Sequence, residues 1–380
     1  MRILYPRAKP YFSDVDIDDI LDEIKDTLQS GNLVQGQRVK EFEDKFAKMV
    51  GTKYAIATNS CTSALELSIR SLGVNGKTVL VPTETFVATG NAVILSGNTP
   101  VFTDIDKSTL CMSYDTIMDR MSDDVAAIII VHMGGLITPD IDKIRNYCKD
   151  NSIYLIEDAA HAHGSKKMTV VNGYYYKTEY AGSLGIAGCF SFYPTKVMTT
   201  GEGGMITTNS KSLMKMARIL RNHGGDGRLG LYSASNDRMT EISAILGISQ
   251  LKHLKSFVDK RNYIASKYRE SLSMISEIQL FSEYEEIKNS YWNFYFILNT
   301  IERKEFIEKM LERGVQIGDA YSPPCHEQPV FEEYISDETF QVTDDILSKH
   351  VSLPMYTELT DEDIYSITDI VKEVINDCKK

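Results

Sequence analysis

One lysine lies where its amino group could do covalent chemistry. Lys196 is in FSFYPTKVMTTGEGGMITTN, residues 190–209, between a short predicted strand and a glycine-rich turn that lets the chain reverse behind it. A lysine whose pKa is lowered by burial in such a place can form a Schiff base with an aldehyde cofactor. Ser191, five residues earlier, offers a hydroxyl for an anion. For a lysine considered alone, a surface loop position is the alternative.

Two adjacent carboxylates follow a predicted buried strand. Glu157 and Asp158 lie in IYLIEDAAHAHG, residues 153–164. Ligand sites of open α/β sheets lie beyond the C-terminal ends of the strands, so we expect one of the two acids to face the site. A carboxylate paired with a pyridinium nitrogen would keep that ring protonated and make it an electron sink. A helix N-cap is the alternative for the acid, and a place in the core is the alternative for the nearby His161.

Two further segments offer contacts for a flat, phosphorylated ligand. In ATNSCTSALELS, residues 57–68, small hydroxylated side chains stand between a predicted strand and a predicted helix. A helix N-terminus has free N–H groups and a positive dipole end, so this segment is a candidate phosphate site, with simple N-capping as the alternative. Phe86 lies just beyond another predicted strand, where an aromatic ring could cover the ligand's ring or could simply pack in the core.

These residues need a scaffold, and the hydrophobic pattern predicts one. Ile17, Ile20, Leu21, Ile24 and Leu28 share one face of a helix that Ser13 would cap and Gly31 would end. A second helix is predicted over 39–51. Strands are predicted at 54–58, 78–81, 100–103, 125–131, 153–156, 190–192 and 205–208, and helices alternate with several of them. This alternation predicts an α/β fold with a largely parallel sheet.

The pattern changes near residue 252. A long charged helix is predicted from about 252 to 274, followed by a strand at 291–298 and helices at 304–313 and 362–375. We therefore predict two domains. Residues 1–251 would form an N-terminal arm and a large ligand-binding domain, and residues 252–380 a small C-terminal α+β domain.

Composition excludes several classes of function. The 380 residues include 41 Lys and Arg against 53 Asp and Glu, a net charge of −12, which argues against a general nucleic-acid or anionic-membrane binder. Six scattered cysteines without a C-x-x-C pair argue against a zinc or redox site and favour reduced thiols in the cytoplasm. The N-terminal residues lack an apolar targeting segment. A Rossmann dehydrogenase is excluded because no G-x-G-x-x-G follows a strand.

Taken together and in this order, the motifs resemble the DegT/StrS family of nucleotide-sugar aminotransferases, which are pyridoxal 5′-phosphate (PLP) enzymes of fold type I, the aspartate aminotransferase fold. The combination of the lysine–GEGG segment with EDAAHAHG is the most specific part of the resemblance. It continues through residues 30–43, 221–224, 235–251, 321–331 and 352–354.

The resemblance implies a role for each motif residue. Lys196 would form the Schiff base with PLP and transfer the proton, and Asp158 would bind the pyridine nitrogen. The implied cofactor contacts also include Cys61, Thr62, Phe86, His161, Ser191 and Asn236. Asn236 would reach the cofactor of the neighbouring subunit, so the resemblance implies a homodimer with shared sites. Arg238, Arg228 and His326 are candidate substrate contacts, and no metal is implied.

The implied reaction moves an amino group from an amino acid, most often glutamate, to a keto-sugar linked to a nucleotide. Pyridoxamine phosphate is the carrier, and the product would serve surface polysaccharide synthesis, such as lipopolysaccharide O-antigen, or a related amino-sugar pathway. One alternative is a sugar dehydratase of the same family, against which Lys196 argues because that branch carries His there. Another is a PLP-binding regulatory protein without turnover, although no DNA-binding segment is expected.

Three features depart from the family pattern. Cys61 replaces the Gly of a Ser-Gly-Thr phosphate turn, and its backbone N–H remains available. Asp237 replaces an aromatic residue of an Asn-Tyr-Arg-Met motif. Residues 166–180 form a longer segment than the usual hairpin. Its tyrosines either shape the sugar site or belong only to a surface hairpin.

Overall fold

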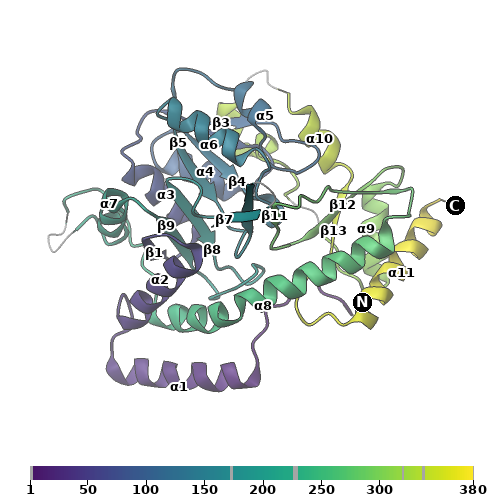
Figure 1. The fold of residues 1–380 in the computed structure, drawn as a ribbon, viewed down its shortest axis with the longest axis horizontal. Helices are drawn as coiled ribbons and strands as arrows, with labels where there is room; N and C mark the ends of the chain where they lie inside the picture. The colour runs from purple at the N-terminus through teal and green to yellow at the C-terminus, as the bar shows by residue number, and fades with distance from the viewer. Residues whose placement is uncertain (1–2, 172–173, 226–229, 319–320, 336–338, 380) are drawn as a thin grey trace.

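A seven-stranded sheet forms the centre of the computed structural model, which describes residues 3–171, 174–225, 230–318, 321–335 and 339–379 (Figure 1). Its strand order is β1-β9-β8-β5-β4-β2-β3. The strands are β1 (Tyr54–Thr58), β2 (Thr78–Pro82), β3 (Thr99–Thr103), β4 (Val125–Val131), β5 (Tyr154–Asp158), β8 (Ala187–Ser191) and β9 (Gly204–Thr208). The neighbours from β3 to β8 pair in parallel, and β9 runs antiparallel to β8 and β1. The predicted α/β fold with a mostly parallel sheet is confirmed.

Helices cover both faces of this sheet. One face carries α3 (Cys61–Ser71), α4 (Val87–Leu95) and α7 (Lys211–Arg221), and the other carries α2 (Gln37–Val50), α6 (Ile141–Asp150) and the first half of α8 (Glu241–Leu272). In β4, Ile128 and Ile130 join the core under α2 and α6, whereas Ala127 and Ile129 join the core under α3 and α4. Successive side chains of a strand point to opposite faces, which explains why this whole strand is apolar.

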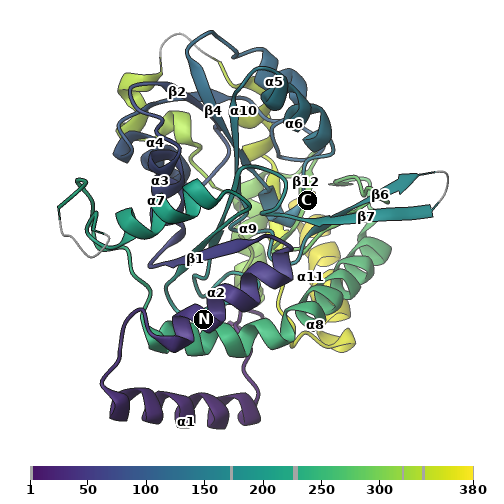
Figure 2. The same ribbon diagram turned by 60° about the vertical axis from the view of Figure 1, so that its left-hand side comes forward.

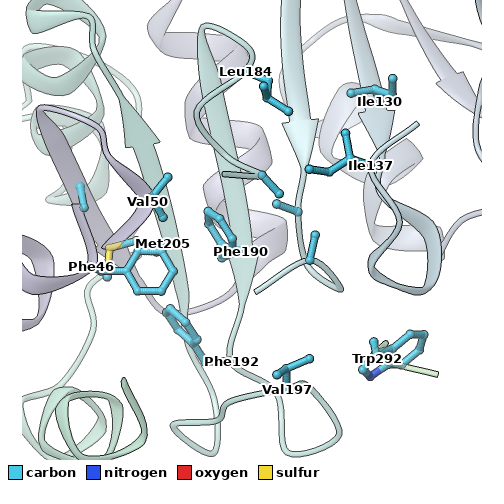
Figure 3. Close-up of a cluster of buried hydrophobic side chains, with 14 of the residues drawn as sticks. Phe46, Val50, Ile130, Ile137, Leu184, Phe190, Phe192, Val197, Met205 and Trp292 are labelled. Atoms are coloured by element: carbon cyan, nitrogen blue, oxygen red, sulfur yellow. The ribbon is translucent and has the colours of Figure 1, made fainter. Parts of the chain in front are cut away.

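Aromatic rings fill the core beneath α2. The ring of Phe46 lies 4.9 Å from that of Phe190, centroid to centroid, and 5.5 Å from that of Phe192. Figure 3 shows this cluster, with Val197 and Trp292 at the end away from Phe46. The core therefore extends from the sheet to the loop after β8, which carries Lys196.

A second unit follows in the chain. The strands β10 (Ile278–Leu280), β12 (Phe294–Leu298) and β13 (His350–Leu353) form an antiparallel sheet, and α9 (Arg303–Glu312) and α11 (Asp361–Cys378) pack on it. This unit agrees with the predicted small α+β domain. Elsewhere the chain also forms the short elements α5 (Tyr114–Met118), α10 (Gln341–Leu347) and the 3₁₀ turns η1 (Met133–Gly135), η2 (Cys325–Glu327) and η3 (Pro329–Tyr334).

The helix α8 joins the two units, and it differs from the prediction. It begins at Glu241 after the N-cap Thr240, not near residue 252, and its second half packs against α11 (Figure 1). Its first turns are largely buried on the large unit and lack the charged pattern that suggested a start at 252. The predicted boundary after residue 251 thus lies inside one continuous helix. Within the described part of the chain, no helix has the length and apolar character to cross a membrane.

The N-terminal segment is divided between the two units. Tyr5 forms a parallel bridge with Val315, so the first residues lie along the small unit. The prediction had placed them with the large unit. The helix α1 (Asp14–Ser30) then lies under α8, apart from the rest of the molecule in Figures 1 and 2. Ser13 caps it and Gly31 ends it at φ 73°, as predicted. Much of its predicted apolar face is exposed, including Leu21 and Leu28.

The segment 166–180 forms a β-hairpin. The strands β6 (Lys166–Val171) and β7 (Tyr174–Tyr180) pair with each other, and β11 (Ile287–Lys288) pairs with β6. The hairpin projects from the body of the molecule in Figure 2. Tyr180 packs against the main core. The side chains of residues 170–176 lie outside the described part, so the predicted alternatives for the hairpin tyrosines stay open.

Candidate active site

A cavity of about 720 Å³ lies where the C-terminal ends of the parallel strands face the small unit. Its lining includes Cys61, Thr62, Phe86, Asp158, His161, Ser191 and Lys196, seven of the residues predicted for the site. The opposite wall includes Arg7, Trp292 and Gln316, which no motif indicated, and Tyr321, which begins the matching segment 321–331 but was given no role. The cavity occupies the position where ligands bind in open α/β sheets.

Lys196 lies in the loop between β8 and β9. Its Nζ atom is 4.4 Å from the centroid of the Trp292 ring. Burial lowers the pKa of its ammonium from 10.5 to about 8, and the nearby Asp158 carboxylate opposes part of that change. A lysine with this pKa carries a usable fraction of neutral amine near neutral pH, so it can act as a nucleophile and as a base.

Steric constraints require glycine at two positions that follow Lys196, Gly201 and Gly204. Gly201 has a φ of 79°, a left-handed conformation that side chains rarely adopt. A Cβ atom on Gly204 would come within 2.2 Å of the Ser60 carbonyl oxygen. The glycine-rich turn thereby brings the lysine loop against the start of α3.

The two carboxylates at the end of β5 have opposite surroundings. Glu157 is fully buried and accepts hydrogen bonds from three backbone N–H groups of residues 182–185. The N···O distance is 2.7 Å in each of them. His132 Nε2 lies 2.9 Å from the same carboxylate. Glu157 is therefore held inside the fold, whereas Asp158 lines the cavity. Of the two acids, Asp158 is the candidate for the predicted contact with a ligand.

Asp158 is a buried acid directed at a cavity. Its Oδ2 accepts a hydrogen bond from Thr89 Oγ1 over 2.9 Å, and its Oδ1 accepts one from the Ala160 N–H over 3.1 Å. Burial raises the pKa of this carboxyl above its usual value. Among the described residues, no Lys, Arg or His nitrogen is within ion-pair distance of it. A buried carboxylate without an ion-pair partner among the described residues is suited to a ligand that carries a positive charge. A protonated pyridine nitrogen would supply that charge.

The first turn of α3 is available for an anion. Ser60 caps the helix by accepting a hydrogen bond from the Ser63 N–H, and Cys61 and Thr62 begin the helix beside the cavity. Backbone N–H groups in a first helical turn have no intrahelical acceptor, and the helix dipole favours negative charge there. Ser191 lines the same cavity. These groups suit a phosphate, and N-capping and anion binding both apply at this helix.

His161 packs against Trp292, a cavity residue that no sequence motif indicated. Its ring stacks on Trp292 with centroids 3.6 Å apart, and its Nε2 lies 2.7 Å from the Tyr321 hydroxyl. Within the described part of the chain, its Nδ1 has no hydrogen-bond partner. Burial lowers the pKa of His161 well below its usual value, which keeps the ring neutral. Trp292 was assigned to a strand at 291–298, but β12 begins at Phe294 and leaves the indole in the connection facing the cavity. The composition held a signal, since the chain has one tryptophan.

Phe86 lies in the cavity wall with 55% of its surface exposed. It is the N-cap residue of α4, and its ring centroid lies 5.4 Å from that of Tyr321. Core packing, the alternative for Phe86, is excluded by this exposure. An exposed aromatic side chain beside buried polar groups suits a stacked ligand ring.

Two other predicted residues lie outside the cavity of their own chain. Asn236 is exposed, and its side-chain oxygen accepts a hydrogen bond from Arg238 Nε over 2.8 Å. Arg238 also donates to Asn222 Oδ1 over 3.1 Å. Arg228 lies outside the described residues. Asp237, which replaces the expected aromatic residue, is buried and accepts from Ser63 Oγ over 3.0 Å.

His326 also lies away from the described cavity lining. Its Nδ1 lies 2.6 Å from Thr83 Oγ1, its Nε2 lies 3.0 Å from an Asp344 oxygen, and its ring stacks on Phe340. Both ring nitrogens thus have partners within the fold. This arrangement gives His326 a structural environment, and the predicted substrate contact lacks support from its position.

The comparisons with known proteins show the family of this chain. The sequence profile of the DegT/DnrJ/EryC1/StrS aminotransferase family matches residues 14–372. The chain is 30% identical over 347 residues to GDP-perosamine synthase of Escherichia coli O157:H7, covering 90% of this chain and 92% of that protein. It is 30% identical over 376 residues to UDP-4-amino-4,6-dideoxy-N-acetyl-beta-L-altrosamine transaminase of Campylobacter jejuni, with 96% of both proteins covered.

A solved structure extends the agreement to three dimensions. The PLP form of a candidate sugar aminotransferase, Spr1654 from Streptococcus pneumoniae, matches with a TM-score of 0.87 and 26% identity. The match covers 98% of this chain and 99% of that one. The motif resemblance, the fold type I architecture and PLP as the cofactor are thereby confirmed. The chain belongs to the DegT/DnrJ/EryC1/StrS aminotransferase family and is a PLP-dependent aminotransferase.

Proposed function

We propose that this enzyme moves the amino group of an amino acid, with glutamate as the expected donor, to the keto group of a nucleotide-linked sugar. The product would serve the synthesis of a surface polysaccharide or a related amino sugar. Relatives named for GDP- and UDP-linked amino sugars support this substrate class. The observation that carries the proposal is that one cavity is lined by a lysine with a pKa of about 8 and by a buried carboxylate that has no ion-pair partner among the described residues.

Lys196 and Asp158 would do the chemical work. When bound, PLP supplies a reactive aldehyde and an electron-withdrawing ring. Lys196 would hold that aldehyde through its neutral amine, and its Nζ would take up and return the proton of the donor carbon that carries the amine. A pKa of about 8 suits this exchange near neutral pH. Asp158 would hold the proton on the facing ring nitrogen, because a carboxylate stabilises the charged form beside it.

Other residues would hold the cofactor in place. The N–H groups of Cys61 and Thr62 and the hydroxyl of Ser191 would bind the phosphate at the positive end of α3. The exposed ring of Phe86 would stack on the cofactor ring. His161, neutral and with Nδ1 unpartnered among the described residues, would lie near the ring hydroxyl.

A homodimer is part of the proposal. Asn236 is exposed and lies outside the described cavity lining of its own chain, as a residue that serves a partner's site would. Exposed apolar side chains on α1, among them Val15, Leu21 and Leu28, offer surface for self-association. All six cysteines are unpaired, which supports the expected cytoplasmic location.

The absorption spectrum of the purified protein tests the function directly. Protein supplied with PLP should show the yellow band of a lysine-bound cofactor, and glutamate should convert it to the spectrum of pyridoxamine phosphate. Nucleotide-linked keto-sugars should then restore the first spectrum. A protein that binds PLP but responds to no amino acid would point to the dehydratase alternative. A protein that cannot bind PLP would contradict the assignment of the site.

A further inference from the structure

Tyr321 and His161 lie far apart in the chain and meet at the cavity, which both of them line. The Tyr321 hydroxyl oxygen lies 2.7 Å from His161 Nε2. The two rings are inclined by 23°, with their centroids 5.8 Å apart. The indole of Trp292 stacks on the same imidazole at 3.6 Å. The stacked indole and the hydrogen-bonded phenol together fix the orientation of the imidazole ring.

The direction of the hydrogen bond between these two side chains follows from their chemistry. Burial lowers the pKa of His161 well below its usual value, so the neutral ring has one N–H group and one nitrogen lone pair. Burial raises the pKa of the Tyr321 hydroxyl well above its usual value, so the oxygen keeps its proton. A phenol O–H is a stronger donor than a neutral imidazole N–H, and the imidazole lone pair is the stronger acceptor. The favourable bond therefore runs from the Tyr321 O–H to Nε2, and the distance of 2.7 Å is at the short end for an N–H donor.

This bond decides which nitrogen of His161 carries the ring proton. When the lone pair of Nε2 accepts from Tyr321, the proton must be on Nδ1. Among the residues that the structure describes, this Nδ1 is buried and has no hydrogen-bond partner. A buried N–H group without an acceptor is unfavourable, so it is suited to a ligand that supplies an oxygen atom, above all a negatively charged one.

We infer that Tyr321 is a positioning residue, which places the proton of His161 on Nδ1 and so makes this nitrogen a donor to the ring oxygen of PLP. The inference rests on the placement of the cofactor under the proposed function. In PLP the ring oxygen lies beside the aldehyde, on the side away from the phosphate arm. With the aldehyde at Lys196 and the phosphate at the start of α3, this oxygen would lie towards the wall that includes Tyr321. The other tautomer of His161 would present a lone pair there and repel the oxygen.

NMR of the full chain labelled with ¹⁵N-histidine tests the inference without any substrate. The protonated and unprotonated nitrogens of a neutral imidazole have well-separated shifts, and their couplings to the carbon-bound ring protons distinguish Nδ1 from Nε2. The His161 signal is identified by its loss in His161→Gln. Spectra with and without PLP are recorded for the wild type, for Tyr321→Phe, which keeps the aromatic ring, and for a control. The control is Tyr263→Phe, which removes an exposed hydroxyl that donates to Asp361 over 2.9 Å, and circular dichroism checks folding.

The proton of His161 should be on Nδ1 in the wild type and in Tyr263→Phe. In cofactor-free Tyr321→Phe, a measurable share of the molecules should carry it on Nε2, because the donor to that nitrogen has been removed. A wild-type proton on Nε2 would overturn the inference, and this result does not depend on the folding of any variant. An unchanged proton position in folded Tyr321→Phe would also overturn it, because another group would then fix the tautomer.

The affinity for the cofactor supplies a second readout. The probes are PLP and 3-deoxypyridoxal 5′-phosphate, which lacks the ring oxygen. Tyr321→Phe should weaken PLP binding about 3- to 10-fold, the loss expected for one hydrogen bond, and should leave binding of the analogue nearly unchanged. Tyr263→Phe should match the wild type with both probes. Equal weakening of both probes by Tyr321→Phe would show that Tyr321 acts only by packing, and the inference would be wrong.

These measurements separate the inference from the proposed function, because neither uses the amino donor or the keto-sugar. If the wild-type protein converts no amino acid or no keto-sugar, the proposed function fails, while the proton position and the two affinities still report on Tyr321. Conversely, an enzyme that transfers the amino group with His161 protonated on Nε2 would support the proposed function and contradict this inference.

Discussion

The Nζ atom of Lys196 lies 4.4 Å from the centre of the Trp292 ring, and the same indole donates its N–H to the carbonyl oxygen of Thr195 over 2.7 Å. Trp292 thus contacts both the lysine side chain and the backbone just before it. The indole also stacks on His161. Trp292 lies in the connection that leads into β12 of the small unit. Its contacts with Thr195 and Lys196 therefore link the lysine loop of the large unit to the small unit. We expect it to position Lys196.

Substitution of Trp292 should change the pH dependence of the enzyme. A cation–π contact contributes about 0.5–2 kcal/mol, so Trp292→Leu should lower the pKa of Lys196 by up to about 1.5 units. Trp292→Phe keeps an aromatic face but leaves the Thr195 carbonyl without its donor, so it should slow turnover with a smaller change in pKa. The pH profile of kcat/KM measures both effects. Profiles identical to the wild type in both variants would contradict a positioning role.

Replacement of Lys196 by Ala should abolish transamination while the fold remains intact. The side chain lies at the cavity, and the sheet and its cores do not depend on it. Turnover is measured with glutamate and a keto-sugar nucleotide, and circular dichroism and thermal unfolding report on the fold. Full activity in Lys196→Ala would disprove the assignment of the nucleophile.

The stability of the cofactor-free protein should rise with pH through the titration of Lys196. The pKa is 10.5 when the lysine is exposed and about 8 in the fold, so between these values the unfolded chain binds more protons, and unfolding becomes less favourable as pH rises. The shift corresponds to roughly 3 kcal/mol. Urea unfolding of wild type and Lys196→Met from pH 7 to 10.5 measures it. The variant should be more stable at pH 7, and its advantage should shrink by that amount. A constant difference would show that the lysine is not buried.

The adjacent carboxylates should respond in opposite ways to removal of their charge. Asp158→Asn should retain PLP but lose most of its turnover, because an amide cannot stabilise a proton on the ring nitrogen. Glu157→Gln should instead destabilise the fold by about 2–4 kcal/mol, since an amide NH₂ would face buried backbone N–H donors. Urea unfolding and the rate per folded molecule distinguish the two. A near wild-type rate for Asp158→Asn would refute its role.

Mixing two inactive variants should reveal shared active sites. Lys196→Ala lacks the lysine, and Asn236→Ala lacks the side chain expected to reach the partner's cofactor. A mixed dimer of the two would contain one site in which both residues are intact, so mixing should restore part of the activity. The assay is run alongside native mass spectrometry, which establishes that mixed dimers form. Mixed dimers without activity would argue against sharing.

Local sequence was sufficient for the residues that lie near one another in the chain. The helix α1 has its cap at Ser13 and its end at Gly31 because both are properties of the adjacent residues. The strand β4 was recognisable because burial on both faces requires a continuous apolar run. The motif residues were found because strand ends, a helix N-terminus and a glycine-rich turn each leave a local pattern. By contrast, the start of α8 was misplaced, because its first turns are buried by tertiary contacts.

The sequence by itself determined the α/β class, the resemblance to the family, and the set of residues from Cys61 to Lys196 that meet at one cavity. The residue pattern alone left Glu157 and Asp158 as equivalent candidates, and only the family resemblance pointed to Asp158. Their difference was decided by what each faces, the buried N–H groups of a distant loop or the cavity. It also gave no indication of Arg7 and Trp292. Both reach the site only because the N-terminal segment and the small unit pack against the large one, and no local pattern records contacts between residues so far apart in the chain.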